Sequence, residues 1–265
     1  MKRIGHAMGL AVWLGFLMGG WTAAGGADLP SRPALHSHAE MSQLLRSWSG
    51  EHADILRLAS LARTREGRDV WLCEIGRGSP EERSQRPAML VVSGVEGNTL
   101  AGNENALGFI ESLCRSQAEE IQTLLNAVTI YVIPCLNPDA AERFFAAPQM
   151  EQNTNLTPFD QDHNGLVDED GPDDLDQDGM ITWVRVQDPK GKFIAHPGDG
   201  RILIEADPAK DEAGRWLYFE EGLDNDKDEK INEDRLGGIN LNANFPFDYP
   251  FFGDESGLHP MSEAE

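Results

Sequence analysis

The sequence predicts an α/β fold, built on a mixed and mostly parallel β-sheet with helices on both faces. Two apolar runs, AMLVVSG (88–94) and AVTIYVIPCLNPD (127–139), are continuous rather than alternating, as is typical of strands buried on both faces of a sheet. Between them, residues 103–125 carry apolar side chains at helical spacing, with a break expected near Ser116. A strand, a helix and a strand joined by connections of this length form a parallel pair with a crossover helix.

Two further elements are expected before this unit. The segment 38–62 has apolar residues at helical spacing on both sides of a break at Gly50, which predicts two helical stretches. These residues are Met41, Leu44, Leu45, Trp48, Ile55, Leu56, Leu58 and Leu61. The run DVWLCEIG (69–76) predicts a short strand that ends at a glycine.

Charge and the N-terminal pattern limit the classes of function. The 265 residues carry a formal net charge of −23, which excludes nucleic acid as a partner because a phosphate-binding surface must be basic. A basic start, MKRIGH, precedes the apolar run AMGLAVWLGFLMGGW and the small residues TAAGGA. This pattern predicts a signal peptide at 1–27 and export of the mature domain, 28–265, to the periplasm or the extracellular space. The run is shorter than the ~20 residues that span a bilayer, so no membrane span is expected after signal removal.

Five motifs follow one another along the mature chain. They are TREGRDVWLCEIG (64–76), SGVEGNTLAGNENAL (93–107), LNPDAAERF (136–144), GGINLNANFPFDY (237–249) and HPMSEAE (259–265). In sequence and in order they resemble the zinc carboxypeptidase family typified by carboxypeptidase A. The resemblance covers nearly all of the mature chain. It implies a carboxypeptidase A-like fold, here incomplete, and a zinc enzyme that acts on peptide or protein C-termini.

The resemblance also places the family's first two zinc ligands, a His and a Glu three residues later. The matching residues in this chain are Glu96 and Thr99. A hydrolytic zinc site needs three protein ligands and a fourth position for water, and a threonine hydroxyl is a poor ligand. We therefore expect that the zinc ligands are not retained.

The family's substrate-binding pair, an Asn followed by an Arg, corresponds here to Asn242 and Ala243. A methyl group cannot replace the guanidinium that holds the terminal carboxylate of a peptide with two hydrogen bonds. In the family, the third zinc ligand and the catalytic Glu lie beyond the position that matches Glu265. The expectation is that no catalytic residue is retained, and that sheet normally covered by later elements is exposed.

An acidic insertion at about 153–236 predicts calcium loops. Oxygen-bearing side chains alternate in D-x-D-x-N-G and D-x-D-x-D-G, where Gly165 and Gly179 permit a sharp turn as in an EF-hand loop. The bidentate Glu of the twelfth position is missing, since Gly171 and Arg185 stand there. In a third run, DNDKDEKINED, Glu229 replaces the glycine. The predicted calcium ligands are Asp160, Asp162, Asn164, Asp168, Asp174, Asp176, Asp178, Asp224, Asp226, Asp228 and Asn232.

Three functional hypotheses remain open at this point. The chain is an active zinc-dependent carboxypeptidase with an unusual metal set, or a catalytically inactive, calcium-stabilised domain that binds peptide or surface material. The third hypothesis is a gene fragment whose missing part completes the site. The substitutions at the ligand positions favour the second and third, while the alternative for the acidic runs is a solvated linker. The sequence gives no indication of the oligomeric state.

Overall fold

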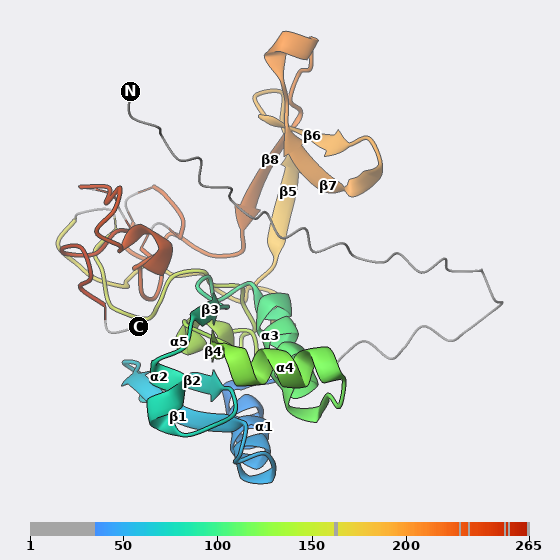
Figure 1. Ribbon diagram of the computed structural model, residues 1–265. Coiled ribbons are helices and arrows are strands. Elements are labelled where there is room, and N and C mark those ends of the chain that lie inside the picture. Colours follow the sequence, from blue (N-terminus) through green and yellow to red (C-terminus); the bar gives the residue numbers. More distant parts are fainter. Residues whose placement is uncertain are drawn as a thin grey trace, which may run out of the picture. The chain divides into compact units, whose positions relative to one another are not determined.

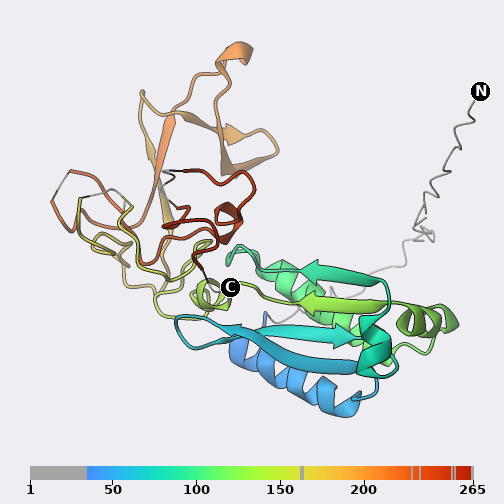
Figure 2. The ribbon, with the colours of Figure 1, turned by 60° about the vertical axis from the view of Figure 1, so that its left-hand side comes forward.

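The larger of two sheets has four strands in the order β1-β2-β4-β3 (Figures 1 and 2). The computed structural model describes residues 35–161, 164–227, 229–232, 234–251, 253 and 255–263, so the signal peptide predicted at 1–27 lies outside it. The strands are β1 (Leu56–Arg63), β2 (Asp69–Ile75), β3 (Ala88–Val92) and β4 (Thr129–Ile133). Two pairs, β1 with β2 and β2 with β4, are antiparallel, whereas β3 and β4 are parallel. The mixed α/β sheet is confirmed, although the antiparallel pairs outnumber the parallel one.

The parallel pair has the crossover that the sequence predicts. Helices α3 (Leu100–Arg115) and α4 (Glu119–Ala127) connect β3 to β4, and the chain leaves the helical conformation at Ser116. Both helices pack on one face of the sheet, together with α1 (His38–Glu51) and α5 (Pro138–Glu142). The strand residues of this core alternate along β2 and β4: Trp71, Cys73, Ile75, Ile130 and Val132.

The opposite face of the sheet has a thinner cover. Helix α2 (Pro80–Ser84) reaches one end, where the Arg83 guanidinium pairs with Glu74 at 3.3 Å. Towards the other end, a small apolar cluster includes Ile133 and Leu241, which belongs to the 3-10 turn η2 (Leu241–Ala243). The helix layers expected on both faces are therefore very unequal among the described residues.

Strand β3 corrects one expectation. Its run of apolar residues predicts burial on both faces, but Leu90 is 62% exposed and Val92 is 40% exposed. The physical reason is its place in the sheet, because β3 pairs with β4 on one side and is the edge strand of the described order.

The segment 56–63 corrects a second expectation, because it is strand β1 and not a helix. Helix α1 forms as expected and begins with a capping box between Ser37 and Glu40. Beyond it, Leu56 and Leu58 are also two residues apart, so their spacing fits a strand as well as a helix. Backbone pairing with β2, from Leu56 opposite Ile75 onwards, decides between the two periods.

A second, smaller sheet lies within the acidic insertion and has the order β5-β8-β6-β7 (Figure 1). Its strands are β5 (Trp183–Gln187), β6 (Phe193–His196), β7 (Asp199–Glu205) and β8 (Trp216–Glu220), with the 3-10 turn η1 (Pro208–Lys210) before β8. All the pairs are antiparallel. None of the helices in the described part of the chain is long and apolar enough to cross a membrane.

A buried carboxylate anchors the turn between β1 and β2 to the start of α5. Asp139 is 1% exposed and accepts hydrogen bonds from Thr64 Oγ1 at 2.7 Å and from the Glu66 N–H at 3.0 Å. Its third partner is the Arg68 guanidinium at 2.7 Å. Because a charge without a partner is costly inside a protein, this network requires all of its members.

We expect Asp139→Ala to lower the free energy of unfolding by about 3–5 kcal/mol, since it leaves Arg68 and Thr64 without their acceptor. Urea denaturation followed by circular dichroism measures this loss. The control is Glu66→Ala, which removes an exposed carboxylate 3.8 Å from the same guanidinium and should cost less than about 1 kcal/mol. Equal effects from the two variants would contradict the role given to Asp139.

Candidate functional site

The loops that follow β3 and β4 lie against each other, as a parallel pair requires. Three backbone hydrogen bonds of 2.8–2.9 Å join residues 93–94 to residues 133–137. Gly94 has a φ of 63°, and a Cβ at that position would meet the Asn103 side chain and the Cys135 backbone. A Cβ on Gly97 would overlap the Ala140 side chain. The two glycines therefore allow the close approach of these loops.

Glu96 and Thr99, at the family's ligand positions, lie in the turn between β3 and α3. The Glu96 carbonyl accepts a hydrogen bond from the Thr99 N–H at 3.0 Å, and the Thr99 side chain is exposed. The Thr99 hydroxyl donates to Asn98 Oδ1 at 3.4 Å rather than capping α3. Across the residues that the structure describes, no three His, Cys, Asp or Glu side chains converge around this turn. These residues do not fit a zinc ion.

The substrate-binding positions are found in η2. The Asn242 N–H donates to Asn240 Oδ1 at 3.0 Å, and the Asn242 side chain is exposed. Ala243 ends the turn and is partly buried. Leu241, immediately before the pair, packs in the small apolar cluster on the sheet. The turn is held in place by apolar packing, but it offers no guanidinium at the position where the family has one.

The three acidic runs share one backbone geometry. We call them loop 1 (160–170), loop 2 (174–182) and loop 3 (224–234). In each loop, Oδ2 of the first aspartate accepts a hydrogen bond of 2.9–3.0 Å from the N–H five residues later. The donors are Gly165, Gly179 and Glu229, with φ values of 94°, 84° and 78°. The repeat in the sequence is therefore also a repeat in the structure.

Loops 1 and 3 are tied to each other by two fully buried carboxylates. Asp234 of loop 3 accepts from the N–H groups of Gln161 and Asp168 in loop 1, at 2.7 and 3.0 Å. In return, Asp170 of loop 1 accepts from residues 225 and 232 of loop 3, at 2.9 and 2.7 Å. An isolated antiparallel bridge also joins the backbones of Asp170 and Asp234. The two loops thus form a reciprocal pair.

Glu221, directly after β8, is the carboxylate that accepts the corresponding backbone hydrogen bonds of loop 2. Its carboxylate accepts from the N–H groups of Leu175 at 2.7 Å and of Thr182 at 3.2 Å. In all three loops the two donors stand one and eight residues after the first aspartate. Burial favours the neutral form of Glu221, but the hydrogen bonds outweigh it and lower its pKa.

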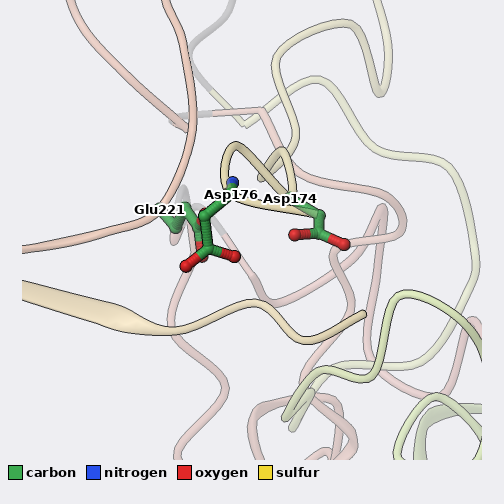
Figure 3. Close-up of side chains that lie close together, drawn as sticks. All are labelled: Asp174, Asp176 and Glu221. Carbon is green, nitrogen blue, oxygen red and sulfur yellow. Dashed lines mark hydrogen bonds between the residues drawn. The ribbon is translucent and has the colours of Figure 1, made fainter. Parts of the chain in front are cut away.

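Loop 2 also brings three carboxylates to one point. Asp174, Asp176 and Glu221 each offer an oxygen, and these oxygens lie within 4.8 Å of one another (Figure 3). Glu221 comes from outside the loop and supplies the carboxylate that the twelfth position lacks. Oxygen ligands at this spacing suit a hard cation such as Ca²⁺.

Glu169 of loop 1 and Asp234 of loop 3 hold their carboxylates in contact. Burial, followed by a hydrogen bond to Glu169, raises the pKa of Asp234 to about 6. Glu169 Oε2 and Asp160 Oδ1 are both buried and have no hydrogen-bond partner in the described part of the chain. Buried carboxylate oxygens without partners are costly, and a bound cation would satisfy them.

The predicted ligands are brought together to different degrees. Asp162 and Asp228 lie outside the described residues. The Asn164 amide reaches Asp226 across loops 1 and 3, at 3.4 Å. Asp168 accepts a hydrogen bond from the Gly237 N–H, which lies beyond loop 3, and Asp178 accepts one from the Met180 N–H in its own loop. The Asn232 amide donates to the carbonyl groups of residues 220 and 221.

Four acidic residues that the sequence reasoning missed belong to these loops: Glu169, Asp170, Glu221 and Asp234. A sequence signal existed for three of them, since a Glu-Asp pair stands nine and ten residues after the first aspartate in both loop 1 and loop 3. Glu221 has no such signal, because it lies 47 positions beyond the first aspartate of loop 2 and reaches it through the fold.

The match to a known family covers the first three of the five motifs. The zinc carboxypeptidase family model matches residues 41–166. Human carboxypeptidase Z is 29% identical over 110 residues, which cover 40% of this chain and 17% of that protein. Mouse carboxypeptidase D is also 29% identical over 110 residues, covering 41% of this chain and 8% of its own. The carboxypeptidase A structure from Helicoverpa armigera has a TM-score of 0.42 at 20% identity, covering 46% of this chain and 29% of that one.

Through residues 41–166 the chain is similar to the zinc carboxypeptidase family. The matched segment spans less than a fifth of the length of the two curated relatives. The shared segment holds β1 to β4, α3 and the turn with Glu96 and Thr99.

Loop 3 gives a direct test of the shared loop geometry. Glu229 is exposed and adopts a φ of 78°, where the other two loops have glycine. We expect Glu229→Gly to raise the free energy of unfolding by about 1 kcal/mol, because glycine has no Cβ to strain at positive φ. Thermal melting measures the change as a shift of about 2–4 °C. Glu229→Ala keeps the Cβ and should give no gain; a gain of the same size in both variants would point to charge instead.

Proposed function

We propose that this chain is a catalytically inactive member of the zinc carboxypeptidase family, a calcium-stabilised and exported domain. The observation that carries the first part is the turn after β3. It has close-packed glycines and hydrogen bonds to the neighbouring loop, and it presents Glu96 and Thr99 at the positions that, by the resemblance, match the family's His and Glu.

The chemistry of these residues supports inactivity. Zinc polarises water when three nitrogen, sulfur or carboxylate ligands hold it and leave one position open. Thr99 supplies an exposed hydroxyl, which does not ionise near neutral pH, and Glu96 alone gives one carboxylate. Ala243 lacks the guanidinium that would orient the terminal carboxylate of a peptide through two hydrogen bonds. Both the metal and the substrate contacts of the family are affected.

We expect no zinc-dependent release of C-terminal residues from peptides by the purified chain. The assay compares a peptide that has a free C-terminus with the same peptide blocked by an amide, each with excess zinc and with chelator. Zinc titration calorimetry on Glu96→His/Thr99→Glu should show tighter zinc binding than the unaltered chain, and Asn98→His in the same turn should not. Turnover of the free peptide alone, abolished by chelator, would sink the proposal.

The calcium proposal rests on the loops. Loop 2 offers three converging carboxylates, and loop 1 has buried carboxylate oxygens without partners. All three loops have the sharp turn of a calcium loop after the third ligand position. Calcium is available at high concentration outside cells, where even loops of modest affinity are filled. Export through the N-terminal segment therefore fits the same proposal.

We expect calcium to raise the melting temperature and chelator to lower it. A ligand that binds only the folded state adds about 2.7 kcal/mol at a hundred times its dissociation constant. Differential scanning calorimetry with calcium, magnesium and chelator measures the effect.

Asp176→Asn removes one of the three converging carboxylates and should reduce the calcium-induced shift without lowering stability in chelator. The control is Asp211→Asn, an exposed residue between β7 and β8 that should leave the shift unchanged. A melting temperature that ignores both calcium and chelator would leave these loops as acidic linkers.

A further inference from the structure

One face of the smaller sheet is made mostly of apolar side chains. In the pair β5 and β8, the register puts Val184 opposite Phe219 and Val186 opposite Leu217, so these four side chains share a face. Phe193 stands opposite Trp216 on the other face, so Ile194 and its partner Ile204 share the face of Val184, and alternation along β6 and β7 adds His196 and Ile202 next to a register shift. The apolar members, which we call the apolar face, are Val184, Val186, Ile194, Ile202, Ile204, Leu217 and Phe219.

The charged residues of these strands stand at the alternate positions, which face the opposite side of the sheet. They are Arg185, Asp199, Arg201, Glu205 and Glu220. On their side of the sheet, aromatic rings cover one another: Trp183 and Tyr218 lie 4.7 Å apart, and the Arg185 guanidinium stacks over Trp216 at 5.2 Å. That side mixes charged and aromatic side chains, with Trp183 54% exposed, whereas the seven side chains of the apolar face carry no polar group.

The apolar face is uncovered in the described chain. Val184, Val186 and Phe219 are 46–48% exposed, and Ile202 is 52% exposed. A sheet of this kind requires a second layer, because folds bury the apolar face of a sheet against another element. Exposed patches that are contiguous and wholly apolar mark interaction sites in soluble proteins.

The distribution of charge indicates what the second layer is. Residues 183–220 contain 6 Lys or Arg and 7 Asp or Glu, a net charge of −1, so the other residues carry −22 of the total of −23. Two copies of so acidic a chain repel each other over most of their surface. At this sheet the repulsion is smallest, and an apolar face is complementary to its own copy around a two-fold axis.

We propose that the apolar face binds the same face of a second copy of this chain, so that the two small sheets stack as a symmetric β-sandwich. Facing sheets in a sandwich lie about 10 Å apart with their side chains interdigitated. Four of these side chains are 46–52% exposed and three are less exposed, so together they offer at most on the order of 500 Å² per copy, and the dimer buries at most on the order of 1,000 Å², the lower limit of a specific interface. The dimer is therefore weak and depends on concentration.

Sedimentation velocity of the full purified chain tests this at physiological salt. We expect monomer at about 1 µM and a growing dimer fraction up to about 100 µM. Val186→Lys places a charge in the interface and should raise the dissociation constant at least about 10-fold. Gln187→Lys, the matched control, adds the same charge on the adjacent residue of β5, which faces the other side, and should leave the constant unchanged.

A second experiment applies if Val186→Lys fails to fold. The native thiols of Cys73, Cys114 and Cys135 are buried, and burial raises their pKa values to about 12, 11 and 12, so they do not react with maleimides at neutral pH. Val186→Cys should be cross-linked to a dimer by a bismaleimide that spans about 10 Å, and Gln187→Cys should not. A monomeric chain at about 100 µM, equal dimerisation of the two lysine variants, or equal cross-linking of the two cysteine variants would overturn the proposal.

Discussion

The reciprocal hydrogen bonds of Asp170 and Asp234 hold the acidic part of this chain together. Each carboxylate is fully buried and accepts two N–H groups of the opposite loop. A buried carboxylate is stable only when such donors solvate it, so neither loop can adopt its conformation without the other. The segment between them, including loop 2 and the small sheet, starts and ends at this pair, and loop 2 is also held by a backbone bridge between Gln149 and Met180.

In residues 41–166, the contacts that hold the fold together are separate from the side chains at the expected zinc-ligand positions. The glycines at 94 and 97, the loop-to-loop hydrogen bonds and the Asp139 network depend on backbone approach and on buried polar groups. None of these uses the side chain of Glu96 or Thr99, so the framework does not depend on the side chains at these two positions. A structural metal would be different, because its ligands would be part of the stability of the framework.

The sequence predicted most of the larger sheet, since β2, β3, β4 and the crossover helices follow from continuous or helical apolar runs. It was wrong at 56–63, where Leu56 and Leu58 fit two periods and only pairing with β2 selects one. It was also wrong about the burial of β3, because burial depends on which layers cover a strand. In the candidate site, local spacing found the loops, but not Glu221, whose position depends on the strands between.

The bridge between Asp170 and Asp234 means that the chain leaves and re-enters the carboxypeptidase-like framework at nearly one place. Segments whose two ends meet in space are the ones that a domain can accept or lose with little disturbance, because no other part of the backbone has to move. The small sheet and loop 2 lie wholly between those ends. The segment is therefore one unit of the chain, but its loop 2 also pairs with the backbone of Gln149, so its removal would leave those hydrogen-bonding groups without partners.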